Sequence, residues 1–157
     1  MNWSDLNLMP AMPEIVLLAL LGVVLLADLW ICDKNRYLTH LMSLGTVIVV
    51  AITQLAVWEQ GSIDAFHGMY IADGMSRLAK LVLYALTFGL FIYSKPYNQD
   101  RQIFKGEFYT LSLFALLGMS VMVSSAHFLT AYIGLELLSL SLYAMIAPVS
   151  YTHLRAH

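Results

Sequence analysis

Five long apolar segments constrain this chain more than any other feature of its sequence. A helix needs about 20 apolar residues to cross the hydrocarbon core of a bilayer. The five segments reach or approach that length, and they cover residues 11–31, 38–58, 74–94, about 107–124 and about 127–147. Unpaired backbone groups are costly in lipid, so each segment is expected to be an α-helix. The sequence therefore predicts an all-α polytopic membrane protein with about five transmembrane helices.

The composition of the chain supports this class and excludes several others. Of its 157 residues, 60% are hydrophobic and 11% are charged, whereas a soluble domain has about 25% charged residues. The lipid bilayer is therefore an expected partner, and a net charge of −2 gives no reason to expect a nucleic-acid partner. The single cysteine, Cys32, cannot form an intrachain disulfide or a cysteine-based metal site. We expect no metal site, because no set of His, Asp and Glu residues has convincing ligand spacing.

Positive charges in the connections predict the orientation of the chain. Lysine and arginine are enriched on the cytoplasmic side of membrane proteins. The N-terminal tail and the second and fourth connections contain none, and the basic residues of the first and third connections are Lys34, Arg36, Lys95, Arg101 and Lys105. The first and third connections are therefore predicted to be cytoplasmic and the N-terminus to lie outside.

Residues near the predicted helix ends are expected to meet water or lipid headgroups. Four aromatic residues are interpreted as interfacial anchors, namely Trp30, Trp58, Tyr93 and Tyr109. For Glu14 and Asp28, near the two ends of the first segment, solvated positions are favoured over buried ones. Glu107 opens the fourth segment, where a carboxylate suits the positive end of the helix dipole.

A cation near the start of the third segment has two interpretations. Lys80 lies about six residues into that segment, or about 9 Å along a helix axis. Its ammonium group either reaches back to the interface or is buried facing other helices, and the sequence does not separate the two. Arg77 shares its helical face three residues earlier, and Asp73 is a candidate counter-ion for either.

Glu136 is the strongest functional candidate in the sequence. It is about the tenth residue of its segment, so both membrane surfaces lie about 15 Å away. A charge at this depth costs a few kcal/mol. Glu136 is therefore expected to face protein, either protonated and hydrogen-bonded or ionised beside a cation or water. A role in a proton pathway is favoured over a purely structural interhelix hydrogen bond.

Polar neighbours support this interpretation of Glu136. Tyr132, Ser139 and Tyr143 place three hydroxyls on roughly the same helical face. His127 begins the same segment and has a side chain that titrates near neutral pH. An ordinary interfacial role is favoured for His127, with membership of the proton pathway as the alternative.

The last two segments carry a family resemblance. The stretch "GEFYTLSLFALLGMSVMVSSAHFLTAYIGLELLSLSLYAMIA" resembles the fourth and fifth helices of the antiporter-like subunits of respiratory complex I, above all subunit N of bacterial NADH–quinone oxidoreductase. The pieces "EFY", "GLELLSLSLY" and the upstream "ADG" at 72–74 carry the likeness. The resemblance extends over residues 1–147, and the motif in the fifth segment is its most specific part.

This resemblance implies a function for the chain. Such subunits translocate protons across the bacterial inner membrane, driven by quinone reduction elsewhere in an enzyme complex. Glu136 matches a glutamate that pairs with a buried lysine on a later helix, and Lys80 is matched to a basic position on the third helix. The family implies other membrane subunits of complex I as partners. It also implies no cofactor in this chain, because quinone, NADH, FMN and the iron–sulfur clusters belong to the wider complex.

The resemblance also implies that the chain is the N-terminal part of a longer antiporter-like bundle of about fourteen helices. The helix that carries the partner lysine would lie beyond the fifth segment, so the chain alone is expected to be inactive. Residues 148–157, "PVSYTHLRAH", are interpreted as a translated sequencing adapter. A genuine polar cytoplasmic tail containing Arg155 is the alternative.

Two other functions stay open on the sequence. The chain could come from a related multisubunit sodium/proton antiporter or membrane-bound hydrogenase. It could also be a small structural or assembly membrane protein without transport activity, in which Glu136 only holds helices together.

Overall fold

The computed structural model describes residues 8–30, 36–58, 63–66, 68–101 and 106–154. Within these residues the chain forms five long helices and one short β-hairpin, with a single 3₁₀ turn at Met9–Ala11 before the first helix. The elements are α1 (Met12–Trp30), α2 (Arg36–Ala56), β1 (Ile63–Ala65), β2 (Tyr70–Ala72), α3 (Gly74–Arg101), α4 (Glu107–Val123) and α5 (Phe128–Leu154). The expected all-helical fold with five helices is confirmed.

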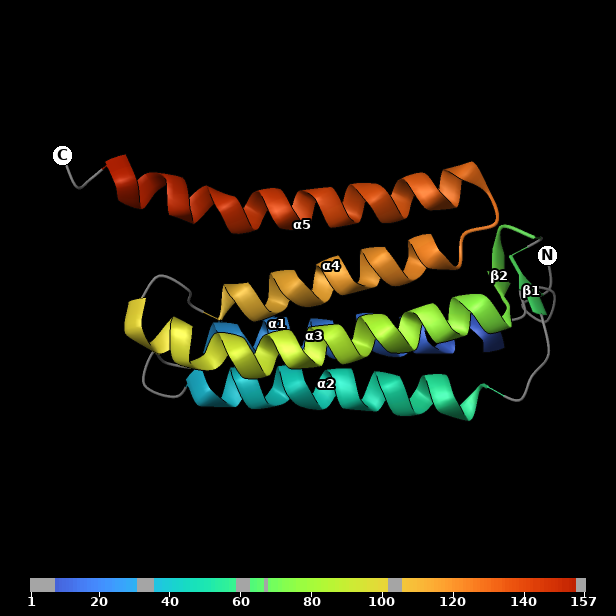
Figure 1. Ribbon diagram of the computed structural model, residues 1–157, viewed down its shortest axis with the longest axis horizontal. Coiled ribbons are helices and arrows are strands. Elements are labelled where there is room, and N and C mark those ends of the chain that lie inside the picture. The colour runs from blue at the N-terminus through green and yellow to red at the C-terminus, as the bar shows by residue number, and fades with distance from the viewer. Residues whose placement is uncertain (1–7, 31–35, 59–62, 67, 102–105, 155–157) are drawn as a thin grey trace.

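The helices run roughly along the long axis of the molecule (Figure 1). Helices α1 to α4 pack against one another, and α5 lies on the outer side of the bundle against α4. The hairpin, the first turns of α1 and α3, and the turn between α4 and α5 lie at one end, which we call the hairpin end (Figure 1). The start of α2 and the start of α4 lie at the opposite end.

Apolar side chains from four helices form the core between them. In α1, Leu17, Leu21 and Val24 follow a spacing of four and three residues, which places them on one helical face, and all three are buried. The rest of the fully buried apolar core comes from α2, α3 and α4, and includes Val47, Val50, Tyr84, Phe91, Leu113 and Leu116. Buried serines in these helices donate to carbonyls of their own helix, so they add no unpaired polar group to the core.

Two glycines allow α4 and α5 to pack closely. A Cβ atom on Gly118 would lie 2.7 Å from the carbonyl oxygen of Gly134, and one on Gly134 would lie 2.8 Å from the carbonyl oxygen of Gly118. These distances leave no room for a side chain at either position. Small residues allow this close approach of backbones in membrane helix pairs.

The helix boundaries differ from the predicted ones in several places. Helices Met9–Trp30, Tyr37–Ala56, Gly74–Ser94 and Phe128–Ala147 are long and apolar enough to span a membrane, whereas α4 has 17 residues and is shorter. The third helix does not end at residue 94 as predicted, because α3 continues through Pro96 to Arg101. A proline removes only one backbone donor, so a helix can continue across it with a local kink. Helix α5 runs to Leu154, beyond the predicted end at residue 147.

The β-hairpin lies in the second connection, between the predicted segments 38–58 and 74–94, and no strand was predicted there. Its two strands pair antiparallel, with Ala65 opposite Tyr70. Gly68 in the turn has φ +80°, a conformation that glycine adopts without steric cost. The backbone N–H of Ile71 donates to the Ser124 carbonyl at 2.9 Å. This contact joins the hairpin to the turn between α4 and α5.

One predicted interfacial aromatic residue is buried instead. Tyr109 is 7% exposed, and its ring lies 5.4 Å from that of Phe91 and 5.3 Å from that of His40. The first turn of α4 is covered by α2 and α3, so the interfacial interpretation of Tyr109 is wrong. Trp30 and Tyr93 are exposed, in agreement with an interfacial position.

Glu107 lies in the first turn of α4, as expected.

Candidate functional site

Three polar side chains from different elements meet at the hairpin end. Glu14 lies in the first turn of α1. Lys80 lies in the second turn of α3, about 9 Å from its start by helical rise. Tyr70 is the first residue of β2, where the buried residues alternate with a half-buried one, so that Tyr70 points into the bundle. The hairpin therefore brings a phenol to a place that both helices reach with a charged group.

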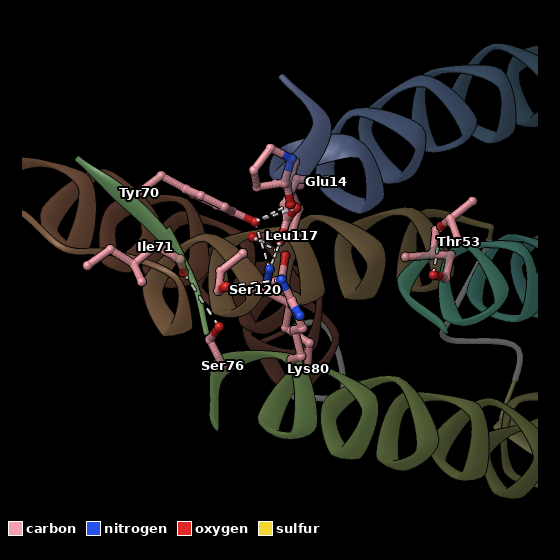
Figure 2. A network of polar contacts seen from close by, with 12 residues as sticks. Glu14, Thr53, Tyr70, Ile71, Ser76, Lys80, Leu117 and Ser120 are labelled. Carbon is pink, nitrogen blue, oxygen red and sulfur yellow. Dashed lines mark hydrogen bonds and ion pairs between the residues drawn. The ribbon is translucent and has the colours of Figure 1, made fainter. Parts of the chain in front are cut away.

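The contacts among these residues form a closed ring. The Lys80 Nζ atom lies 2.6 Å from Glu14 Oε1 in an ion pair. Lys80 Nζ also donates to the Tyr70 hydroxyl at 2.7 Å, and that hydroxyl donates to Glu14 Oε2 at 2.8 Å. Figure 2 shows the three side chains pointing toward one another from α1, β2 and α3. We call them the Glu14–Tyr70–Lys80 cluster.

The cluster is shielded from solvent. Glu14 is 7% exposed, Tyr70 is 4% exposed and Lys80 is 0% exposed. Removing a charge from water is costly unless a partner of opposite charge compensates for the lost hydration. Here one ammonium and one carboxylate compensate for each other. The ammonium group lies beyond the Tyr70 oxygen at the edge of the ring, 5.0 Å from the ring centroid, so its contact with Tyr70 is the hydrogen bond to the hydroxyl.

Tyr70 acts as a neutral bridge in this cluster. Burial, and then the Glu14 carboxylate, raise the pKa of the Tyr70 hydroxyl far above its usual range. The phenol therefore keeps its proton at any physiological pH. A hydroxyl has one proton to donate and lone pairs to accept with. It can thus donate to Glu14 and accept from Lys80 at the same time.

Arg77 and Asp73, the other charged residues near the start of α3, have contacts of their own. Arg77 donates from Nη1 to the Trp58 carbonyl at 2.7 Å and from Nη2 to the Ala72 carbonyl at 3.2 Å. Asp73 precedes α3 and accepts from the Ser76 N–H at 2.8 Å, as an N-cap residue does. These hydrogen bonds from Ser76 lower the pKa of the Asp73 carboxyl. The predicted counter-ion role of Asp73 is therefore replaced by capping, and Glu14 is the ion-pair partner of Lys80.

Two further hydroxyls lie beside the cluster. Tyr84 is one helical turn after Lys80 on α3, and Ser124 ends α4. Both are 1% exposed, and neither side-chain oxygen has a hydrogen-bond partner among the described residues. Both are close enough to Tyr70 to influence its hydroxyl. These polar atoms therefore lie next to the cluster, in the interior of the bundle.

The structure decides between the two interpretations of Lys80 and corrects that of Glu14. Lys80 is a buried cation and does not reach to the interface. Glu14 was expected to be solvated, and this was wrong, because the hairpin covers the first turn of α1. No local sequence pattern predicts the contact between Tyr70 and Glu14, because the two residues are 56 positions apart in the chain.

The predicted site residue Glu136 lies elsewhere. It is exposed on α5 and faces away from the other described helices, so it does not meet Lys80. Its neighbours Tyr132 and Tyr143 are 49% and 70% exposed, and Ser139 donates to a carbonyl of its own helix at 2.6 Å. The expectation that Glu136 faces protein is not met by any part of the chain that the structure describes.

The predicted site residue His127 has a local contact. Its Nδ1 atom accepts the Leu129 N–H at 3.2 Å at the start of α5. This hydrogen bond satisfies one of the unpaired donors that a helix start leaves. Across the described residues, no three His, Cys, Asp or Glu side chains are grouped as a metal site would need. Cys32 lies outside those residues.

Comparison with known proteins relates the sequence to one group of proteins. No family model matches the chain. NADH-quinone oxidoreductase subunit N of Neisseria gonorrhoeae is 75% identical over 147 residues, which is 94% of this chain and 31% of that protein. The subunit N proteins of Laribacter hongkongensis and Thioalkalivibrio sulfidiphilus are 50% and 46% identical over 147 residues, or 30% and 31% of their lengths. The chain thus spans about a third of the length of these relatives.

A solved structure has the same fold. A chain of respiratory complex I from Thermus thermophilus with bound aureothin matches with a TM-score of 0.67 and 24% sequence identity. The match covers 92% of this chain and 33% of that chain, so the five-helix arrangement corresponds to part of a larger chain. Over 147 of its residues, this chain therefore corresponds in sequence to part of subunit N of NADH-quinone oxidoreductase.

Proposed function

We propose that this chain is part of a proton-translocating membrane subunit of NADH–quinone oxidoreductase, in which Glu136 is a proton-carrying group. The 75% identity to subunit N over 147 residues carries the proposal. The enzyme complex would couple quinone reduction in other subunits to proton movement through this one. The quinone, NADH, FMN and iron–sulfur sites would all lie outside this chain.

The position of Glu136 supports this role. It is the ninth residue of the apolar helix span Phe128–Ala147, about 12 Å from the start of that span by helical rise. A carboxylate in contact with lipid at this depth would cost a few kcal/mol. Glu136 is exposed in the described chain, and the hydroxyl of Tyr132 lies one turn before it. We infer that another protein surface covers this face and supplies a partner for the carboxyl group.

The membrane location and orientation follow from the same proposal. Four apolar helices are long enough to cross a bilayer, and the relatives are bacterial proteins. The chain would therefore lie in the bacterial inner membrane, with other membrane subunits of the complex as its neighbours. The distribution of lysine and arginine favours an outward N-terminus, which would place the hairpin end on the outer side.

The test is a Glu136→Gln substitution in the full-length subunit within its complex. Glutamine keeps the shape and the hydrogen bonding of the side chain but cannot carry a proton. We expect the complex to assemble and NADH-driven proton pumping in membrane vesicles to fall at least about tenfold, equivalent to about 1.4 kcal/mol in barrier height. The matched control is Glu107→Gln, which removes an exposed carboxylate at the start of α4 and should pump normally.

Three outcomes would contradict the proposed function. Normal pumping by the Glu136→Gln complex would remove the residue from the proton pathway. Loss of assembly together with normal pumping per assembled complex would assign Glu136 a structural role between helices. Pumping driven by a sodium gradient without any NADH oxidation would favour an antiporter relative instead.

A further inference from the structure

We propose that the Glu14–Tyr70–Lys80 cluster is a second proton-transfer site, in which a proton moves between Lys80 and Glu14 through the Tyr70 hydroxyl. The inference rests on the proposed role in proton translocation and deepens it by naming a site separate from Glu136. This site lies at the hairpin end, between α1, β2 and α3 (Figure 2). Three observations carry it: the ring of short contacts, the burial of both charges, and the neighbouring hydroxyls.

The first observation is the geometry of the contacts. Lys80 Nζ to Tyr70 OH is 2.7 Å and Tyr70 OH to Glu14 Oε2 is 2.8 Å. Proton transfer between side chains takes place across heavy-atom distances of about 2.6–3.2 Å. The Tyr70 hydroxyl accepts a hydrogen bond from the Lys80 ammonium and donates one to the Glu14 carboxylate. The cluster is therefore a closed ring in which Lys80 and Glu14 are joined both directly, at 2.6 Å, and through the Tyr70 hydroxyl.

The transfer step balances without any other reactant. One N–H bond of Lys80 breaks as its proton forms a new O–H bond on Tyr70. The original O–H bond of Tyr70 breaks as its proton forms an O–H bond on Glu14 Oε2. The products are a neutral amine, an unchanged phenol and a carboxylic acid, and the reverse step restores the ion pair. No electrons are transferred.

The second observation is the burial of both charges. In water, hydration would hold an ammonium and a carboxylate firmly in their charged forms. With Lys80 at 0% and Glu14 at 7% exposure, most of that hydration is lost, which brings the neutral form closer in energy. The net charge of the cluster is the same before and after transfer. Two other charges act on Lys80, those of Arg77 and Asp73. Arg77 donates to backbone carbonyls, and Asp73 accepts from Ser76.

The third observation is the pair of buried hydroxyls beside the cluster. Tyr84 lies one turn further along α3, and Ser124 caps the end of α4, where its carbonyl accepts from Ile71 in the hairpin. Neither oxygen has a hydrogen-bond partner among the described residues, and each can both donate and accept. Both are close enough to Tyr70 to influence its hydroxyl. These hydroxyls are the available continuation of the proton path on either side.

A purely structural clamp is the competing explanation. In that case the ion pair would only hold α1 to α3, and the Tyr70 hydroxyl would only fix the hairpin, where it also lies 3.2 Å from the Pro10 carbonyl. A clamp needs a cation, an anion and a good fit. It does not need a cation that can release its proton, and this difference makes the two explanations separable.

The decisive experiment uses two conservative substitutions in the full-length subunit within its complex. Lys80→Arg keeps the positive charge, but a guanidinium does not release its proton in proteins. Tyr70→Phe keeps the ring and the ion pair but removes the bridging hydroxyl. We expect both complexes to assemble and to oxidise NADH, with proton pumping per NADH oxidised reduced at least about fivefold. The control is Tyr93→Phe, which removes an exposed hydroxyl from the same helix and should pump normally.

A second measurement covers the case in which arginine does not fit at position 80. Infrared difference spectra of the working wild-type complex should contain a protonated-carboxyl band that disappears in Glu14→Gln and shifts in Tyr70→Phe. Normal pumping in both Tyr70→Phe and Lys80→Arg would overturn the proposal. An infrared spectrum with no band sensitive to Glu14→Gln would overturn it as well.

The outcomes separate this inference from the proposed function. If Glu136→Gln loses pumping while Tyr70→Phe and Lys80→Arg pump normally, the cluster is a clamp and the role of Glu136 stands. If the two cluster variants lose pumping while Glu136→Gln is normal, the proton path runs through the cluster without Glu136. Normal pumping in all three would remove both roles.

Discussion

At the residue scale, the structure gives two neighbouring acids at the hairpin end different tasks. Glu14 compensates a buried cation, whereas Asp73 caps the helix that carries that cation. Both are acidic side chains near a helix start. From the sequence alone, Glu14 was expected to be solvated and Asp73 to pair with a cation. The difference arises from Tyr70, which covers Glu14, and from Ser76, whose N–H reaches Asp73 within a single turn.

The cap at Asp73 leads to a pH-dependent prediction. Hydrogen bonds from Ser76 lower the pKa of Asp73 below its ordinary value of 3.8, so the folded state favours the carboxylate. The resulting stabilisation is fully present above that ordinary value and is lost as the pH falls through the lowered one. Asp73→Ala should therefore cost about 0.5–2 kcal/mol at neutral pH and less in acid. Thermal unfolding of the detergent-solubilised subunit at several pH values measures this.

The matched variant for this measurement is Asp73→Asn, because asparagine also caps helices but does not titrate. It should unfold close to the wild type at neutral pH and show a weaker loss of stability in acid. An alanine variant as stable as the wild type at neutral pH would contradict the assigned cap.

At the element scale, the packing of α5 on α4 depends on two positions without side chains. Gly118→Ala or Gly134→Ala would place a methyl group within 3 Å of the facing backbone, so the helices would have to separate. We expect each substitution to destabilise the subunit by about 1–3 kcal/mol, the usual cost of overpacking. Thermal unfolding in detergent measures the change.

The control for these glycines is Gly89→Ala in α3, where a Cβ atom would meet nothing within 4 Å. Alanine there should be neutral or stabilising by up to about 1 kcal/mol, because it restricts the unfolded chain. Equal changes in stability for Gly89→Ala and Gly118→Ala would show that the effect comes from helix propensity and not from the contact between α4 and α5.

The elements differ in how far the sequence predicts them. Long apolar segments identify the five helices, because membrane length and apolar character are local properties that need no knowledge of the fold. The three-residue strands of the hairpin are too short for an alternating pattern to show. The β2 strand also donates a hydrogen bond to the Ser124 carbonyl, which lies on a different part of the chain. The same distinction applies to the site. Lys80 could be identified from its local sequence, whereas its partners Glu14 and Tyr70 lie on elements far away in the chain.

At the scale of the whole molecule, the two ends of the bundle have different chemistry. The hairpin end holds the buried ion pair, and the opposite end holds Arg36 at the start of α2 and Arg101 at the end of α3. We predict that the hairpin end faces the outside of the cell. With Cys32 replaced by alanine, a cysteine at Met69 in the hairpin turn should react with a membrane-impermeant maleimide on intact spheroplasts. A cysteine at Lys34 should react only after the membrane is broken.

The reverse labelling pattern would place the N-terminus in the cytoplasm and the Glu14–Tyr70–Lys80 cluster on the inner side. Labelling of both positions on intact spheroplasts would indicate leaky membranes, and a cytoplasmic marker enzyme retained inside the cells controls for that. This orientation is predicted from the sequence alone, because the prediction depends on charges in the connections and not on packing.

The spacing of the cluster along the chain has a consequence for how the protein is made. Glu14 emerges from the ribosome first, then Tyr70, then Lys80, and Ser124, which holds the hairpin, emerges last. Glu14 can therefore already be in the membrane when α3 is inserted, and the ammonium of Lys80 can meet its counter-charge on entry. During biogenesis, the Glu14 carboxylate on the first helix would pair with Lys80 and so lower the free-energy cost of inserting the third helix into the membrane.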